Sequence, residues 1–174
     1  RIAEVAQALP AECLVVNVQG DEPLISPETI DRAVTASIKT GADIVTVFEP
    51  ITSIQDELLN GNVVKAVVGD KGNAIYFSRS PMPFPRDASL RYGGDPGRAL
   101  SNEPELLANY RKHVGLYVYR REYLLYFTGL PRTKLEEFES LEQLRALEDG
   151  AEIHLVEAAG PSIGVDTPED LDTV

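Results

Sequence analysis

An apolar run that stops abruptly at a glycine places the strongest constraint on this chain. The run Val15-Val16-Asn17-Val18-Gln19 ends at Gly20, and Asp21, Glu22 and Pro23 follow directly. Its β-branched valines predict a strand that is buried on both faces of a parallel sheet. Because open α/β sheets bind ligands at the carboxyl ends of their strands, Asp21 is expected at the rim of a site. A strand followed by a simple acidic turn accounts for the same residues.

Helix signals and strand signals alternate along the chain. Ser26-Pro27-Glu28 is a typical helix start, and Gly41 is a typical helix end. This alternation predicts an α/β fold with a mixed, mostly parallel sheet, in one domain spanning residues 1–174. Strands are expected at residues 15–18, 44–48, 63–68, 74–78, 114–119 and 153–156. Helices are expected at residues 2–9, 26–39, 53–59, 122–127 and 135–148, with a further helix starting at Thr167-Pro168.

Two segments depart from this alternation. Residues 63–68 and 74–78 flank Gly69-Asp70-Lys71-Gly72-Asn73, which predicts a β-hairpin. Residues 80–112 are rich in proline and glycine and show little periodicity, so they are expected to form a long irregular excursion. Excursions of this length inside a compact domain are usually functional or disordered.

Composition excludes several classes of partner. A formal net charge of −12 over 174 residues argues against non-specific binding to nucleic acid or to an anionic membrane surface. No apolar run approaches the ~20 residues that cross a bilayer. The single cysteine, Cys13, favours a reducing, cytoplasmic location. An anionic ligand would therefore need a metal ion or a local cluster of arginines and backbone amides.

A second aspartate occupies the same kind of position as Asp21. Asp166 lies just before the helix start Thr167-Pro168. Two carboxylates that converge at one end of a sheet repel each other unless they share a cation. An oxygen-only site with open positions suits Mg²⁺. Alternatively, Asp166 only caps its helix.

Five motifs stand in the order known from one enzyme family. They are Asn17-Val18-Gln19-Gly20-Asp21-Glu22-Pro23, Tyr76-Phe77-Ser78-Arg79, His113-Val114-Gly115-Leu116-Tyr117, Leu141-Glu142-Gln143-Leu144-Arg145 and Gly164-Val165-Asp166-Thr167-Pro168-Glu169-Asp170-Leu171. Together they resemble the 3-deoxy-manno-octulosonate cytidylyltransferases, also called CMP-Kdo synthetases, over nearly the whole chain. Each motif alone is moderately specific, whereas five in the correct order are a strong signal.

The resemblance implies a fold, a reaction and a set of partners. The fold is a Rossmann-like nucleotide-diphospho-sugar transferase fold with an extension used for homodimerisation. The reaction joins CTP to the eight-carbon acid sugar Kdo and gives CMP-Kdo and pyrophosphate for lipopolysaccharide biosynthesis. In this family Asp21 and Asp166 would hold Mg²⁺ at the catalytic centre.

Sugar-binding residues also follow from the resemblance. His113 and Tyr117 would lie on one face of a strand, Gln19 would bind sugar hydroxyls, and Glu142 and Gln143 would read the Kdo hydroxyls. Arg79 and Arg86 are candidate partners for the sugar carboxylate, since a guanidinium matches a carboxylate in two places. Their alternatives are structural: a buried histidine, a solvated helix face and surface ion pairs.

The family also has a glycine- and arginine-containing loop that holds the CTP triphosphate, and no such loop occurs in these 174 residues. The chain is therefore expected to be the C-terminal portion of such an enzyme, without its first strands and with weak or no activity alone. Other hypotheses are a cytidylyltransferase for another acid sugar, such as a sialic acid relative, or a non-catalytic fragment that binds sugar or dimerises. A metal-dependent glycosyltransferase fits less well, because that class tends to carry its two acids within one loop.

Overall fold

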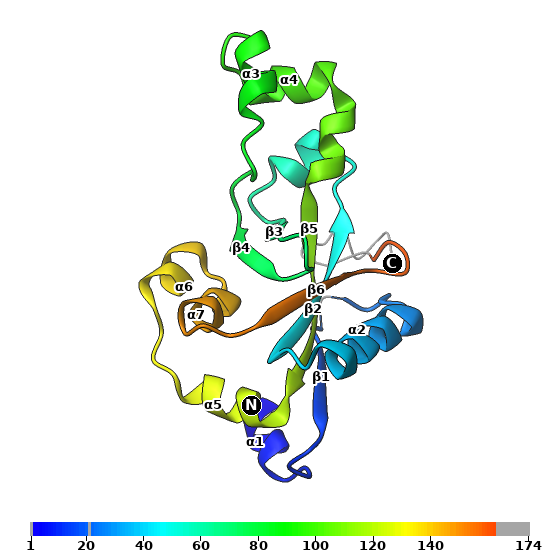
Figure 1. The fold of residues 1–174 in the computed structure, drawn as a ribbon, viewed down its shortest axis with the longest axis vertical. Coiled ribbons are helices and arrows are strands. Elements are labelled where there is room, and N and C mark those ends of the chain that lie inside the picture. Colours follow the sequence, from blue (N-terminus) through cyan, green and yellow to red (C-terminus); the bar gives the residue numbers. More distant parts are fainter. Residues whose placement is uncertain (1, 21, 163–174) are drawn as a thin grey trace.

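The strand β5, Arg111–Arg120, is the centre of the sheet because its side chains alternate between two apolar faces. Tyr117 and Tyr119 belong to the apolar cluster on one face, and Leu116 and Val118 belong to the cluster on the other. Such alternation is what a strand between two layers of side chains requires. The computed structural model describes residues 2–20 and 22–162, and Figure 1 shows β5 running vertically through the middle of the molecule.

Six strands form one sheet in the order β4-β3-β5-β2-β6, and β1 pairs with β5. The strands are β1 (Leu14–Val18), β2 (Ile44–Pro50), β3 (Lys65–Val68), β4 (Ala74–Ser78), β5 and β6 (Ile153–Glu157). The mixed α/β fold and the hairpin between β3 and β4 are therefore confirmed.

The expectation of a mostly parallel sheet is wrong for the described residues. Only β2 and β6 pair in parallel there, and the other ladders are antiparallel. Val16 of β1 and Val45 of β2 both lie opposite Val118, so β5 separates two strands that run in the same direction. Helix-linked strands suggested parallel pairing, but side-chain periodicity carries no information on which strand is inserted between them.

Burial of β1 also differs from the expectation. Val16 and Val18 are each 40% exposed, so this strand is not buried on both faces. In the described residues β1 hydrogen-bonds along one edge, to β5. Valine content predicted the strand correctly, but it did not predict the exposure of Val16 and Val18.

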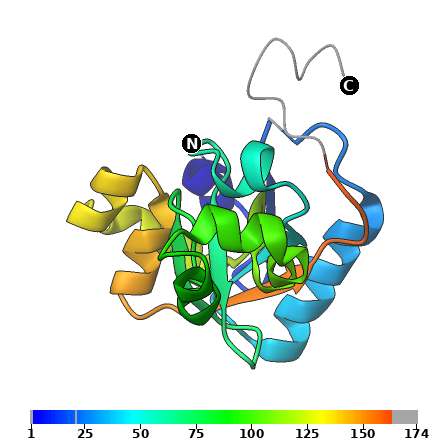
Figure 2. The ribbon, with the colours of Figure 1, turned by 90° about the horizontal axis from the view of Figure 1, so that it is seen from above.

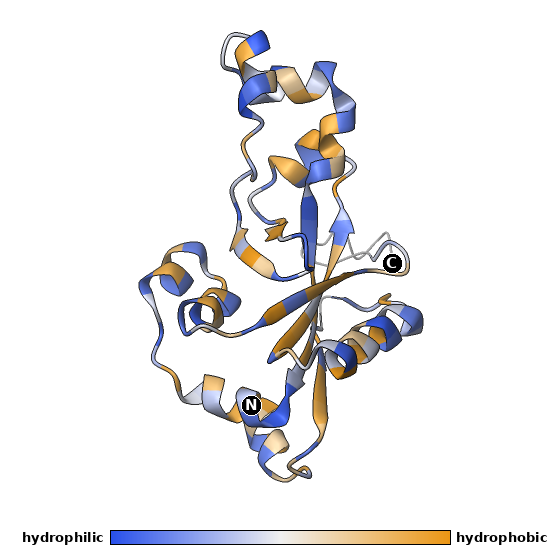
Figure 3. Ribbon diagram, in the orientation of Figure 1, coloured by the Kyte–Doolittle hydropathy of each residue, from blue (hydrophilic) through white to orange (hydrophobic). Residues whose placement is uncertain are grey.

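Helices cover both faces of the sheet (Figure 2). The helix α2, Pro27–Thr40, packs on one face against the cluster that includes Val45, Val47 and Leu116. It begins with the predicted Ser26 cap and ends at Gly41, whose φ is +70°. The remaining helices near the sheet are α1 (Ile2–Gln7), α5 (Arg121–Gly129), α6 (Lys134–Glu139) and α7 (Glu142–Glu148). Figure 3 shows hydrophobic colours along the central strands and mixed colours on the helices.

The predicted single helix at 135–148 is two helices. Ser140 has a φ of +54° and separates α6 from α7. A left-handed residue ends a helix because it turns the next carbonyls out of line. Apolar residues recur every three positions through this point, so periodicity alone concealed the break. They are Leu135, Phe138, Leu141, Leu144 and Leu147.

The expectation that residues 80–112 are irregular is partly wrong. They contain α3 (Arg86–Arg91), α4 (Pro96–Asn102) and the 3₁₀ helix η2 (Pro104–Asn109), which form an arm at the top of Figure 1. Asp95 caps α4 and Pro96 is its first residue, which is the same start signal as that of α2. Short helices escape detection because they complete too few turns to show periodicity.

A small apolar cluster joins the arm to the sheet. Its buried members are Ile51, Leu58, Leu100 and Tyr110. Leu58 ends the short π-helix η1, Ile54–Leu58, at the place where a short helix was predicted. None of the described helices has the length and apolar composition needed to span a bilayer.

Candidate functional site

A polar cleft of about 720 Å³ opens beside β5. Its walls come from the end of β1, the loop at residues 60–64, the start of the arm, the centre of β5 and the turn between α6 and α7. The lining residues are Asn17, Gln19, Glu22, Asp56, Asn60, Asn62, Val63, Val64, Arg79, Lys112, His113, Val114, Gly115, Tyr117, Tyr119, Ser140, Leu141, Glu142, Gln143 and Ser162. Most of these side chains are polar, so the cleft suits a ligand that carries many hydrogen-bonding groups.

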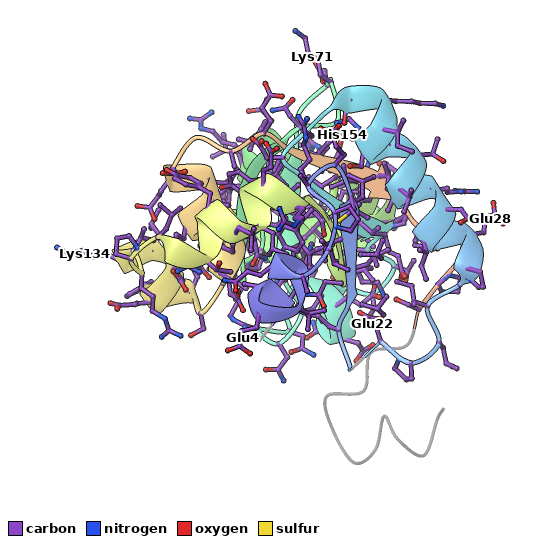
Figure 4. All side chains as sticks on the ribbon, turned by 90° about the horizontal axis from the view of Figure 1, so that it is seen from below. Glu4, Glu22, Glu28, Lys71, Lys134 and His154 are labelled. Atoms are coloured by element: carbon purple, nitrogen blue, oxygen red, sulfur yellow. The ribbon has the colours of Figure 1, made fainter. Side chains whose placement is uncertain are left out.

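The end of β1 is fastened to a bulge in β5. The Gln19 backbone N–H donates to the Gly115 carbonyl at 3.0 Å, and the Gly115 N–H donates to Glu22 Oε1 at 3.3 Å. A Cβ on Gly115 would lie 2.6 Å from Gln19 Oε1, so only glycine lets the Gln19 side chain lie against β5. Figure 4 shows Glu22 at the carboxyl end of β1.

Three neighbouring side chains contact the ring of His113. Its Nε2 lies 2.8 Å from Thr46 Oγ1, and its ring meets the Phe77 ring edge-on at 5.3 Å and the tilted Tyr117 ring at 5.3 Å. Burial lowers the pKa of His113 to about 4, so the imidazole is neutral at neutral pH. The predicted pairing of His113 and Tyr117 on one wall is therefore what the structure shows.

Two cations hold the loop at residues 60–63 by its backbone. Lys65 Nζ donates to the carbonyls of Asn60 and Val63 at 2.9 and 2.6 Å. Arg79 Nη1 donates to the carbonyls of Gly61 and Asn62 at 2.9 and 3.4 Å. Four consecutive carbonyls thus accept from two side chains, which fixes Asn60 and Asn62 in the wall of the cleft.

Arg79 also joins this loop to the turn between α6 and α7. Its Nε donates to the Glu139 carbonyl at 2.9 Å, and its backbone N–H donates to Glu139 Oε2 at 3.0 Å. Ser78 Oγ donates to Glu139 Oε1 at 2.6 Å. Since Glu142 and Gln143 follow this turn, the same bonds position both in the cleft.

Lys112 lies between two carboxylates at the same wall. Its Nζ is 3.1 Å from Glu49 Oε2 and 2.7 Å from Glu57 Oε1. Glu49 Oε1 accepts in turn from the N–H and the hydroxyl of Ser162, at 2.7 and 2.8 Å. This network fixes Ser162 at the cleft although it is far from Glu49 in the sequence.

Most of the predicted sugar-binding residues share this cleft. They are Gln19, Arg79, His113, Tyr117, Glu142 and Gln143. Gln143 is 5% exposed and Glu142 is exposed, so the pair does not form a uniformly solvated helix face. Arg79 uses Nε and Nη1 for protein carbonyls, and a two-point contact with a sugar carboxylate by this side chain stays a prediction.

The structure describes one further predicted site residue, Arg86, and not the two predicted metal ligands. Arg86 is on α3 in the arm, where its side chain is 76% exposed and lies 3.6 Å from Asp87, and it does not line the cleft. Asp21 and Asp166 lie outside the described residues, as does the helix expected after Thr167-Pro168. Among the residues that the structure does describe, no three His, Cys, Asp or Glu side chains gather as a metal centre.

Sequence reasoning missed several residues that line the cleft. Asn17 precedes Gln19 by two positions, and strand periodicity was enough to find it. Lys112 precedes His113, but its two carboxylate partners come from separate elements. From the sequence, Asn60 and Asn62 could be interpreted only as turn residues. Hydrogen bonds from Lys65 and Arg79 to the loop backbone place them in the wall of the cleft.

Known cytidylyltransferases are similar to this chain over most or all of its length. The family profile described as cytidylyltransferase matches residues 1–153. A 3-deoxy-manno-octulosonate cytidylyltransferase from Geobacter sulfurreducens is 47% identical over 178 residues, covering 100% of this chain and 67% of the relative. Its counterpart from Solibacter usitatus is 47% identical over 174 residues, covering 100% of this chain and 62% of the relative.

A solved structure agrees with these relatives. It is a CMP:2-keto-3-deoxy-manno-octonic acid synthetase complexed with CTP, with a TM-score of 0.80 and 35% sequence identity. The match covers 98% of this chain and 63% of the solved one. The chain therefore spans about two thirds of the length of the proteins that it matches.

Proposed function

Because this chain belongs to the 3-deoxy-manno-octulosonate cytidylyltransferase family, we propose that its protein transfers a cytidylyl group from CTP to Kdo. The products are CMP-Kdo and pyrophosphate, and CMP-Kdo serves lipopolysaccharide biosynthesis. The observation that supports the proposal best is the gathering of six predicted sugar-binding residues in one polar cleft. A cytoplasmic location is part of the proposal and rests on the single cysteine.

The chemistry of the cleft suits an acid sugar. The anomeric hydroxyl of the sugar attacks the α-phosphorus of CTP while the bond to pyrophosphate breaks, and the hydroxyl proton passes to solvent water. Such a displacement depends on positioning and on neutralising charge more than on covalent catalysis. Amide, imidazole and carboxylate groups of Gln19, His113 and Glu142 line the cleft, where they would bind and orient sugar hydroxyls.

We propose that Asp21 and Asp166 hold Mg²⁺ for this reaction. The described part of the cleft offers oxygen donors from Asn17, Gln19, Glu22 and Glu142, and oxygen is the donor that Mg²⁺ prefers. Asp21 directly precedes Glu22 in the sequence. Its carboxylate would add an oxygen donor of the same kind as those of the cleft. When bound, Mg²⁺ supplies charge neutralisation at the phosphate and lowers the pKa of the attacking hydroxyl.

Pyrophosphate release from the complete protein tests the reaction. We expect turnover with CTP and Kdo and at least about 100-fold lower kcat/KM with N-acetylneuraminate, because hydrogen-bonding sites reject substrates that leave their groups unpaired. Equal use of both sugars would favour the alternative substrate. Calorimetry that shows binding of Kdo without any binding of CTP would favour a non-catalytic sugar-binding role.

Metal removal tests the magnesium proposal. We expect chelation by EDTA to abolish turnover and added Mg²⁺ to restore it. Asp21→Asn and Asp166→Asn should each lower kcat by at least about 100-fold, since each removes a charged ligand. Asp31→Asn, at an exposed position on α2, is the matched control and should turn over normally. Full activity in EDTA would contradict the proposal.

We further propose that a polypeptide of these 174 residues turns over CTP weakly or not at all. In the described part of the cleft, the two cationic side chains are Lys112 and Arg79. Lys112 Nζ is paired with two carboxylates, and Arg79 Nε and Nη1 donate to protein carbonyls, so few donors remain for a triphosphate. Pyrophosphate release by this polypeptide at the rate of the complete protein would contradict this expectation.

A further inference from the structure

Thr46 is a polar residue between apolar neighbours on β2. It lies on β2 between Ile44 and Phe48, which contact the apolar cluster on the same face of the sheet, and it is 0% exposed. A buried hydroxyl is costly unless it is fully hydrogen-bonded. Thr46 Oγ1 makes two contacts of 2.8 Å, one with the Leu116 carbonyl and one with His113 Nε2.

These two contacts fix the position of one proton. A carbonyl oxygen only accepts, so the single Thr46 hydroxyl proton must lie between Oγ1 and the Leu116 carbonyl. Without that proton, two oxygens 2.8 Å apart would repel each other. Oγ1 is then left to accept, and the hydrogen between it and His113 must belong to Nε2.

A bulge in β5 makes this arrangement possible. The β2–β5 register passes from Thr46 opposite Tyr117 directly to Val47 opposite Val114. Gly115 and Leu116 therefore have no partner on β2, and the Leu116 carbonyl is available to the Thr46 hydroxyl. Because of the bulge, the Leu116 carbonyl orients the hydroxyl proton of Thr46.

We propose that Thr46 is a positioning residue that holds His113 as the Nε2–H tautomer and so presents Nδ1 to the cleft as a hydrogen-bond acceptor for a hydroxyl of the acid sugar. Nδ1 is the remaining ring nitrogen, and no hydrogen bond to it comes from the described side chains. Burial keeps the ring neutral, and a neutral imidazole has one donor and one acceptor. The sugar contact rests on the proposed function, whereas the tautomer does not.

The tautomer is measured without any ligand. Histidine ¹⁵N–¹H spectra of the complete protein should show Nε2 protonated and Nδ1 unprotonated for His113. Protonation at Nδ1 in the wild-type protein would overturn the proposal. This measurement needs no variant, so it stands even if substitutions at Thr46 impair folding.

Variants test the part played by Thr46. Thr46→Val removes the hydroxyl at nearly the same volume, and we expect a mixture of tautomers together with a KM for Kdo raised about 3- to 10-fold. The KM for CTP should not change. Thr46→Ser keeps the hydroxyl and should restore both the single tautomer and the KM. Thr29→Val, at a buried threonine on α2 outside the cleft, is the matched control and should leave the His113 spectrum unchanged.

Kdo titration separates this proposal from the proposed function. Binding of Kdo should shift the Nδ1 resonance, because Nδ1 gains a donor. An unshifted Nδ1 in an enzyme that turns over Kdo would overturn the acceptor role alone. Absence of Kdo turnover would overturn the proposed function and with it the sugar contact, while the tautomer is decided by the ligand-free spectrum. A pure Nε2–H tautomer in Thr46→Val would overturn the role of Thr46.

Discussion

Single residues in this protein act through charges that are largely shielded from bulk water. Lys112 has a side chain 22% exposed and faces Glu49 and Glu57, whose side chains are 6% and 16% exposed. Removing one charge from such a network leaves its partners buried without a counter-charge. The free energy of folding lost in this way exceeds what the intact network contributes. Exposed ion pairs such as Arg32–Glu28 follow a different rule, since water screens them.

Lys112→Met should therefore destabilise the protein much more than Arg32→Met. We expect a loss of about 3 kcal/mol in the free energy of unfolding for Lys112→Met. Arg32→Met should lose less than about 0.5 kcal/mol, because its side chain is 47% exposed. Urea unfolding at neutral pH measures both values. Equal losses would show that the Lys112 network is solvated in solution.

The stabilising effect of Lys112 should also depend on pH. Burial raises the pKa of Glu57, but hydrogen bonds from Lys112, Thr52 and Ser53 outweigh it and hold the pKa below 4.5. Burial lowers the pKa of Lys112, but Glu57 and Glu49 outweigh it and hold the pKa above 10.5. A carboxylate with a lowered pKa stabilises the fold above pH 4.5, and an ammonium with a raised pKa stabilises it below pH 10.5. The difference between wild type and Lys112→Met should be largest between these limits and shrink outside them.

Elements of this fold meet at tight turns that only particular residues allow. Gly72 lies in the β3–β4 hairpin with a φ of +81°, and a Cβ there would lie 2.4 Å from the His154 ring. Leu155 N–H donates to the Gly72 carbonyl at 2.7 Å, so the hairpin turn is fastened to β6. Figure 4 shows Lys71 and His154 on the same side of the molecule. Glycine at this turn thus serves both the hairpin and its contact with β6.

Gly72→Ala should cost about 2 kcal/mol, from backbone strain at positive φ together with displacement of the His154 ring. Gly93→Ala is the matched control, since Gly93 has a φ of +73° and open space around it. It should cost about 1 kcal/mol, from backbone strain alone. Thermal unfolding of both variants gives the comparison. Equal costs would mean that the hairpin moves away from His154 without penalty.

At the scale of the whole molecule, the arm projects from the sheet and exposes apolar side chains. Phe84 and Leu90 are each 61% exposed on or beside α3, and the arm contacts the rest of the protein through the small cluster at its base. Apolar side chains on a projecting element are what an interface between two copies of a chain requires. A homodimer through the arm stays a prediction.

Leu90→Glu should shift the complete protein from dimer to monomer in sedimentation experiments, because it places a charge in the expected apolar interface. The unfolding temperature of the monomer should change little, since Leu90 is mostly exposed. Ile38→Glu on α2, where Ile38 is 71% exposed, is the matched control and should leave the mass unchanged. A monomeric wild-type protein at micromolar concentration would contradict the prediction.

The sequence by itself determined most strands, the first long helix and several of the cleft residues. Ser26, Pro27 and Gly41 bounded α2 correctly, and the Gly69–Asn73 turn fixed a hairpin, because capping and turn formation depend on a few neighbouring residues. Family motifs similarly identified Gln19, His113, Tyr117, Glu142 and Gln143, all of which line one cleft.

Only the tertiary structure decided which strands pair and which side chains meet across the chain. β5 lies between β1 and β2 and reverses the expected parallel pairing, because hydrophobic periodicity fixes the face of a strand but not its neighbour. Thr46 acts on the cleft through a carbonyl inside a bulge, and Glu49 acts through Ser162, which lies far away in sequence. Such contacts depend on distances that no local pattern encodes.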